Sequence, residues 1–148
     1  MLAFVMSTLG GLLMLYYTAT TVPQQMAFNA NLSAQVSASN MLSYRSSVVS
    51  YLTTHPGTTG TVQDASLTFQ AGYVRNPAWT NQITGGTLYV YSKSGYSLPA
   101  GTSSALFAAT QNSPMVGINN NSNLQGPGGI VIPLPAGIPL NALVIVGN

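Results

Sequence analysis

The chain begins with a long apolar segment. Met1 to Tyr17 contains no charged residue, and small side chains extend this segment to Val22. A helix needs about 20 apolar residues to cross a bilayer, so residues 1–22 are predicted to form a membrane anchor. The alternatives are a cleaved signal peptide and a buried core helix. The positive residues that usually precede the apolar core of a signal peptide are missing here.

The next segment is the longest run in the chain without glycine or proline. After Pro23, residues 24–53 predict a helix in two pieces, so residues 23–53 are interpreted as a linker followed by an amphipathic helix. From residue 38 to residue 53, apolar and polar side chains alternate at helical spacing. The apolar face comprises Met41, Tyr44, Val48, Tyr51 and Leu52, and the polar face comprises Ser43, Ser46, Ser47, Ser50 and Thr53. The sequence His55-Pro56-Gly57 is predicted to end this helix.

Residues 54–148 consist of short apolar runs between turn residues, which predicts a small β-rich domain packed on helix 38–53. Thr87 to Ser92 is the clearest strand, with Leu88 and Val90 on one face and Tyr89 and Tyr91 on the other. Ser103 to Gln111 predicts a short helix, and Pro133 suits an edge strand. Further strands are predicted at 67–69, 73–74, 96–98, 115–118, 130–134 and 142–146. The predicted fold class is α+β, with an anchor helix and an amphipathic helix on a small, mostly antiparallel sheet.

The composition argues against chemistry that depends on charged side chains. Charged residues make up 3% of the chain, with a single carboxylate, Asp64, a single histidine, His55, and no cysteine. General acid/base catalysis usually needs paired carboxylates or a partnered histidine, and metal sites need clustered ligands. We therefore expect a non-enzymatic protein without catalytic, cofactor-binding or metal-binding residues. The three cations form no basic patch, which argues against a nucleic-acid partner.

Two groups of residues are candidates for contact with partners. Ala3, Ser7 and Gly11 recur at a spacing of four, which would form a ridge of small side chains for packing against another transmembrane helix. Their spacing can also arise by chance in an apolar helix. Trp79, Tyr89 and Tyr91 are candidates for an interaction surface, and the alternative is that they belong to the core and the sheet faces.

An ordered set of short motifs resembles the PilM family, which accompanies the type IVb thin pili of conjugative plasmids. The set comprises Asn40 to Arg45 with Val48, Val49 and Tyr51, then Pro56-Gly57, Gly60 to Val62, Trp79 to Ile83, Gly85 and Leu88 to Tyr91. The resemblance is strongest between residues 38 and 92. It implies a structural protein of the pilus basal body that aids pilin export or assembly. It also implies location in the inner membrane with the C-terminal domain in the periplasm. The implied partners are other pilus-assembly proteins, pilin or a second copy of the chain.

Two other functions stay open at this point. A minor pilin or pseudopilin would share the apolar N-terminal helix, the proline near position 22 and the amphipathic continuation. Pilins, however, resemble one another in a basic leader and a glutamate at the fifth mature position, and this sequence has Val5 and no basic residue near its start. A secreted adhesin-like binding module would use the tyrosines, but the predicted anchor argues against it.

Overall fold

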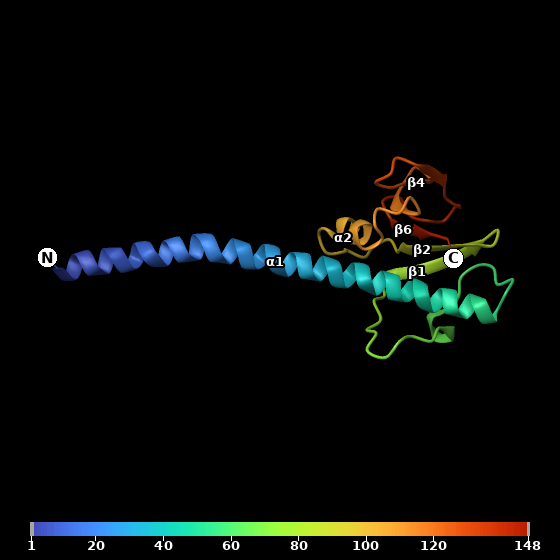
Figure 1. Ribbon diagram of the computed structural model, residues 1–148, viewed down its shortest axis with the longest axis horizontal. Helices are drawn as coiled ribbons and strands as arrows, with labels where there is room; N and C mark the ends of the chain where they lie inside the picture. Colours follow the sequence, from blue (N-terminus) through green and yellow to red (C-terminus); the bar gives the residue numbers. More distant parts are fainter. Residues whose placement is uncertain (1, 148) are drawn as a thin grey trace.

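The first helix dominates the shape of the protein. The computed structural model describes residues 2–147; in the first helix it leaves out the side chains of residues 2–13, 15, 17–21 and 23. Helix α1 (Leu2–Thr54) is a continuous helix of 53 residues, and its first half projects from the folded domain (Figure 1). The predicted division into two pieces is therefore wrong. Pro23 removes one backbone hydrogen bond, but the helix continues because no other glycine or proline follows until Pro56.

Six strands form one antiparallel sheet. They are β1 (Trp79–Thr84), β2 (Thr87–Ser92), β3 (Val116–Asn120), β4 (Asn123–Gln125), β5 (Val131–Pro133) and β6 (Leu143–Val146). Their order is β1-β2-β6-β3-β4-β5, so the strand at the C-terminus lies in the middle of the sheet. Two helices pack on this sheet, which confirms the predicted α+β class. Pro133 lies in β5 at the sheet edge, as predicted.

One face of the sheet packs against α1 and α2 (Thr102–Ala109). The predicted apolar face of α1 is confirmed, because Met41, Tyr44 and Val48 are fully buried there. The assignment of Ser47 to the polar face is wrong. Ser47 lies three residues after Tyr44, at the border of the buried face, and its hydroxyl donates to the Ser43 carbonyl at 3.2 Å. That local hydrogen bond allows the serine to be buried.

The opposite face of the sheet carries a second, smaller core. The segment from Leu134 to Ala142 contributes apolar side chains to it, next to Val144 and Val146 of β6. Tyr89 and Tyr91 are half-buried against this second core, on the opposite face from Leu88 and Val90. This arrangement confirms the predicted alternation along β2.

Several predicted strands are wrong and two real ones were not predicted. Residues 67–69, 73–74 and 96–98 are not strands. From these loops Leu67, Phe69, Tyr73 and Leu98 pack in or against the core, whereas Val74 and Tyr96 are exposed. The unpredicted strands are β1 and β4, whose asparagines and glutamines resemble loop sequence. Gly85-Gly86 connects β1 to β2 with φ of 59° and 77°, and this two-residue hairpin turn requires positive φ.

The chain between α1 and β1 wraps around the helix. Figure 1 shows this segment on the side of α1 that faces away from the sheet. Gly60 and Ile83 exchange two backbone hydrogen bonds, of 2.9 and 2.7 Å, so the segment also covers the outer edge of β1. The C-terminal half of α1 therefore packs between the sheet and this segment and keeps some side chains exposed, whereas residues 24–33 are exposed all round.

Candidate interaction surface

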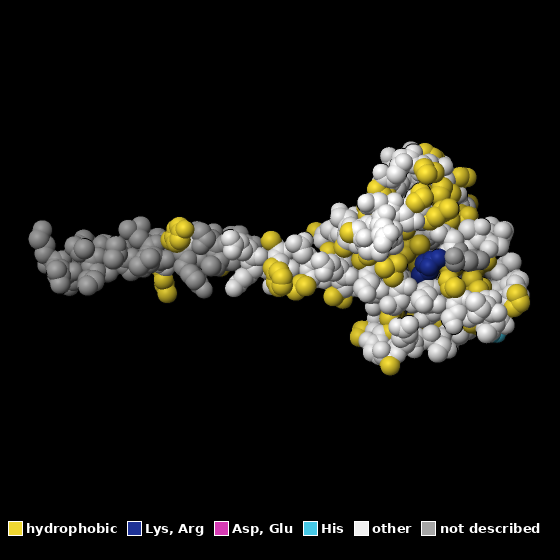
Figure 2. All heavy atoms as spheres, viewed as in Figure 1, with side chains coloured by type: hydrophobic (Ala, Val, Ile, Leu, Met, Phe, Trp, Pro, Cys, Tyr) yellow, Lys and Arg dark blue, Asp and Glu magenta, His cyan; other side chains and the backbone are white. Residues whose placement is uncertain are grey.

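The exposed part of α1 is unusual for a helix in water. No charged residue occurs before Arg45, and the described side chains on this part include exposed Met14, Met26 and Phe28. Figure 2 shows such apolar side chains along the projecting helix. Charged and polar side chains normally cover the solvent face of a helix. This segment is therefore the part of the protein best suited to contact lipid or another protein.

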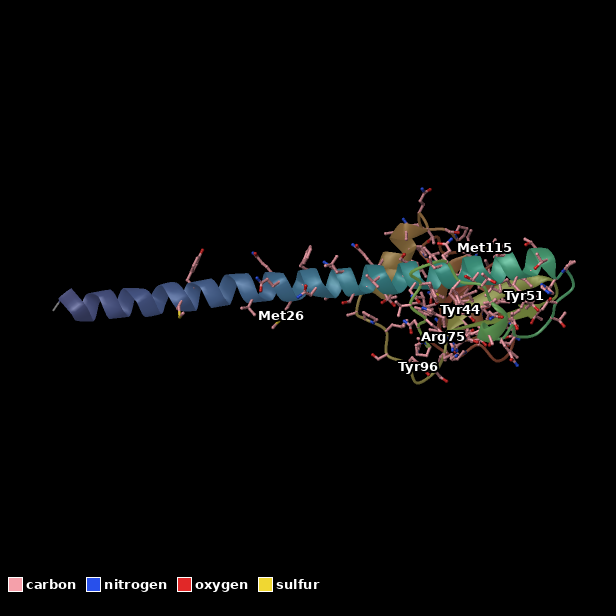
Figure 3. The ribbon with its side chains drawn as sticks, turned by 90° about the horizontal axis from the view of Figure 1, so that it is seen from below. Met26, Tyr44, Tyr51, Arg75, Tyr96 and Met115 are labelled. Atoms are coloured by element: carbon pink, nitrogen blue, oxygen red, sulfur yellow. The ribbon has the colours of Figure 1, made fainter. Side chains whose placement is uncertain are left out.

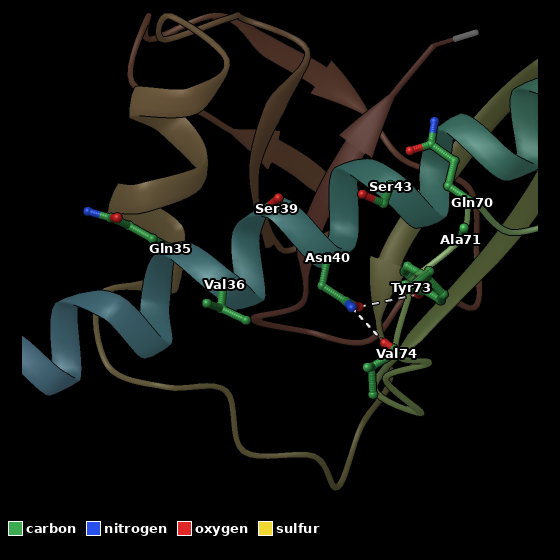
Figure 4. Close-up of a pocket in the computed structure, with 10 residues that line it drawn as sticks. Gln35, Val36, Ser39, Asn40, Ser43, Gln70, Ala71, Tyr73 and Val74 are labelled. Atoms are coloured by element: carbon green, nitrogen blue, oxygen red, sulfur yellow. Dashed lines mark hydrogen bonds between the residues drawn. The ribbon is translucent and has the colours of Figure 1, made fainter.

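The apolar side chains nearest the domain form a continuous patch. Phe28, Leu32 and Val36 are spaced four residues apart, so they lie in one row along α1. Where α1 enters the domain, Val36 and the exposed Val74 line the same two shallow grooves beside the helix. Figure 4 shows Val36 and Val74 on either side of Asn40. We call Phe28, Leu32, Val36 and Val74 the neck patch.

Asn40 holds Val74 in this position. Its Nδ2 donates to the Val74 carbonyl at 2.7 Å, and its Oδ1 accepts hydrogen bonds from Trp79 Nε1 at 2.9 Å and the Tyr73 hydroxyl at 3.3 Å. One amide therefore ties α1 to the wrapping segment and to β1. Because both the nitrogen and the oxygen of its amide are hydrogen-bonded, Asn40 holds the Val74 part of the neck patch in place beside α1.

A second polar network lies one turn further along α1. Asn81 Nδ2 donates to the Tyr44 hydroxyl at 2.8 Å, and that hydroxyl donates to Asp64 Oδ1 at 2.9 Å. Asp64 also pairs with Arg75, which Figure 3 shows in the same part of the domain as Tyr44. Asn81 is fully buried and bonds both the N–H and the carbonyl of Val62. The single carboxylate of the chain thus has a structural role.

We expect the substitution Tyr44→Phe to lower the free energy of unfolding by about 1–3 kcal/mol, because it removes two hydrogen bonds around a buried hydroxyl. Burial raises the pKa of this hydroxyl above its usual value of 10.0. The unfolded chain therefore releases the proton first, and the folded state loses stability as pH rises above that value. Urea unfolding at neutral and alkaline pH measures both effects. The matched substitution Tyr96→Phe, at an exposed tyrosine, should change little.

The structure separates the residues predicted to contact partners. Trp79 is fully buried against α1 and belongs to the core, so its assignment to a surface is wrong. Tyr89 and Tyr91 lie on the other face of the sheet, half-buried. The side chains of Ala3, Ser7 and Gly11 lie outside the described residues, and the ridge stays a prediction.

The neck patch, the partly exposed Asn40 and the buried Asn81 were not predicted from the sequence. The spacing of four from Phe28 to Val36 was a usable signal for the patch. A lone asparagine carries no such signal.

Among the residues whose side chains the structure describes, no helix combines the length and apolar character needed to span a bilayer. The predicted anchor falls almost entirely outside these residues. Among the same residues, no three His, Cys, Asp or Glu side chains gather where they could hold a metal ion.

Comparisons with known proteins relate the whole domain to one family. The chain is similar to the crystal structure of a PilM protein from Escherichia coli B7A, with a TM-score of 0.57 and 20% identity over 79% of this chain and 93% of that one. A PilM protein from Pseudomonas aeruginosa 2192 has a TM-score of 0.46 and 29% identity, over 77% and 95% of the two chains. No curated protein sequence matches. The PilM family model matches residues 10–146, and the chain therefore belongs to the PilM family.

Proposed function

We propose that this protein is a membrane-anchored structural component of a type IVb pilus assembly apparatus. In this proposal the anchor lies in the inner membrane, the C-terminal domain lies in the periplasm, and the protein aids pilin export or assembly. Membership of the PilM family supports a pilus-associated role. The observation that carries the proposal is the uninterrupted helix α1, whose first half projects from the domain without a single charged residue.

The length of α1 suits an anchor followed by a stalk. At about 1.5 Å per residue, the part of α1 that precedes the buried positions is about 48 Å long. The hydrocarbon core of a bilayer is about 30 Å thick. Residues 1–22 would therefore fill the bilayer, and the next turns of the same helix would hold the domain away from its surface. A continuous helix would also fix the direction in which the domain points.

The scarcity of charged side chains supports a structural role over an enzymatic one. The only ion pair among the described residues, between Asp64 and Arg75, is part of the network around Tyr44. Catalysis by proton transfer needs titratable groups in a site where a substrate can reach them. Apart from a few side chains such as Arg75 and His55, the exposed residues are apolar or small and polar, which suits protein contacts.

A minor pilin is the second candidate, because one observation favours it. A long N-terminal helix with its C-terminal half packed on an antiparallel sheet agrees with the features that a minor pilin was expected to share with this chain.

Cell fractionation tests the proposed function. We expect the full chain in the inner-membrane fraction, resistant to alkaline extraction, with an intact mass that includes residues 1–22. Deletion of residues 1–22 should release the protein into the periplasm or the soluble fraction, because the anchor supplies the hydrophobic free energy of insertion. Recovery of the full chain in sheared pili would favour the minor pilin, and recovery of a shortened chain in the medium would favour secretion.

A further inference from the structure

One of the two grooves beside the neck patch combines apolar walls with a cation. Val36 of α1 and Val74 of the wrapping segment form these walls and are 66% and 78% exposed. Arg75 follows Val74 along the same wall, and Pro77 and Pro99 border the groove. Proline has a fixed φ, so these borders are stiff, and the groove, of about 510 Å³, is formed before anything binds.

Arg75 has hydrogen-bond donors to spare. A guanidinium carries five N–H donors, and among the described residues Arg75 donates only through Nη2, to Asp64. The side chain of Arg75 is 59% exposed, whereas that of Asp64 is 16% exposed. Although the pair is neutral as a whole, its positive end therefore faces solvent and its negative end is covered. A second carboxylate can bind the free edge of the guanidinium with two parallel hydrogen bonds.

The groove also contains a hydroxyl without a partner. Ser37 lines the groove and is 5% exposed, and its Oγ makes no hydrogen bond to any described residue. Buried hydroxyls are usually hydrogen-bonded, as Ser47 is through the Ser43 carbonyl. A hydrocarbon chain in the groove would leave the Ser37 hydroxyl unsatisfied, whereas a peptide main chain offers it donors and acceptors after rotation about χ1. The groove therefore suits a polypeptide better than a lipid.

We propose that this groove binds an acidic segment of a different protein, with apolar side chains against Val36 and Val74 and one carboxylate on Arg75. Arginine is among the residues that most often dominate the binding energy of protein interfaces. Apolar side chains of the segment would exclude water around the new ion pair, and the lower local dielectric would strengthen it.

A second copy of this chain cannot supply that carboxylate. Asp64 is the only acidic side chain in the sequence, and it is already bonded to Arg75 and to the Tyr44 hydroxyl. Release of Asp64 from this network would loosen the segment that forms one wall of the groove. The partner is therefore a protein of different sequence. Binding in the groove does not require the membrane location of the proposed function, so the two can be tested separately.

Two peptides that differ by one group test the proposed binding. The probes are acetyl-Gly-Leu-Glu-Val-Gly-amide and the same peptide with glutamine in place of glutamate, each titrated against the ¹⁵N-labelled full chain in non-ionic detergent micelles. We expect the glutamate peptide to shift the NMR signals of Val36, Val74 and Arg75. It should also bind several-fold more tightly than the glutamine peptide, because hydrogen bonds between charged groups are stronger than neutral ones. Arg75→Gln should remove this preference.

Because Arg75 also pairs with Asp64, a second substitution is needed that leaves this ion pair intact. Val36→Glu places a carboxylate in the groove and should weaken binding of the glutamate peptide several-fold through like-charge repulsion. Met26→Glu is the matched control: Met26 is 67% exposed and lies outside the groove, so binding should be unchanged. Trp79 fluorescence during urea unfolding shows whether each variant keeps the domain folded.

Equal affinity for the two peptides, no shift at millimolar peptide, or a preference for glutamate that survives Arg75→Gln would each overturn the proposed binding. The same NMR signals identify other occupants. Shifts that depend on the concentration of the protein alone would assign the groove to a second copy, and shifts caused by dihexanoyl phosphatidylglycerol would assign it to lipid. Either result would overturn the acidic protein partner.

Discussion

Gly117→Ala is expected to destabilise the domain strongly. A Cβ at position 117 would lie 2.6 Å from the Gln125 carbonyl oxygen and 2.9 Å from the Gly126 nitrogen. Both atoms belong to backbone, and Gly117 is held in β3 between β4 and β6. Overpacking of a fixed site costs about 1–3 kcal/mol and occasionally more. We expect the upper end of that range, because no flexible side chain can move aside.

The chain offers a matched control and a built-in probe for this test. A Cβ at Gly128 would meet no atom within 4 Å, and its φ is not positive, so Gly128→Ala should leave stability almost unchanged. Trp79 is the only tryptophan and is fully buried, so its fluorescence reports unfolding of the domain in urea. Similar unfolding midpoints for the two variants would show that β3 and β4 separate more easily than their packing indicates.

Trp79→Ala should lower the free energy of unfolding by about 3–5 kcal/mol, the usual cost of removing a large buried aromatic side chain. Trp79 packs in the main core, and its Nε1 donates to Asn40 Oδ1 at 2.9 Å. Circular dichroism during thermal unfolding would measure the change, since this variant has no tryptophan.

Trp79→Phe separates packing from hydrogen bonding. Phenylalanine keeps much of the buried aromatic surface but cannot donate to Asn40, which still accepts from Tyr73. We expect an intermediate loss of stability. Tyr96→Ala, at an exposed aromatic residue, controls for the loss of a ring as such. A loss for Trp79→Ala no larger than for Tyr96→Ala would contradict the burial of Trp79.

Sequence patterns predicted those elements whose side chains alternate in hydrophobicity. The face of Met41, Tyr44 and Val48 and the alternation along Thr87–Ser92 are confirmed for this reason. Strand β1 was missed because Asn81, a polar residue, occupies a buried position in it. Its burial depends on hydrogen bonds to Val62 and Tyr44, which lie 19 and 37 residues away. Contacts at such separation leave no periodic signal.

Only part of the candidate interaction surface could be predicted from the sequence. Whether Phe28, Leu32 and Val36 are exposed depends on the residue at which the domain begins to cover α1. The sequence predicted a linker in this region, and a linker does not define that residue. Val74 joins the patch only because Asn40 holds its carbonyl, 34 residues away. The sequence left Trp79 as a candidate for either a surface or the core, because an aromatic residue next to polar ones suits both.

The central position of β6 has a consequence for the order of folding. Strands β2 and β3 do not pair with each other, and each pairs instead with residues 143–146. The sheet therefore cannot close until the last strand has been synthesised and has left the ribosome and any translocation channel. Long-range pairing of this kind slows folding. An N-terminal anchor would reach the membrane while the domain is still unfolded, so assembly of the sheet would take place beside the bilayer.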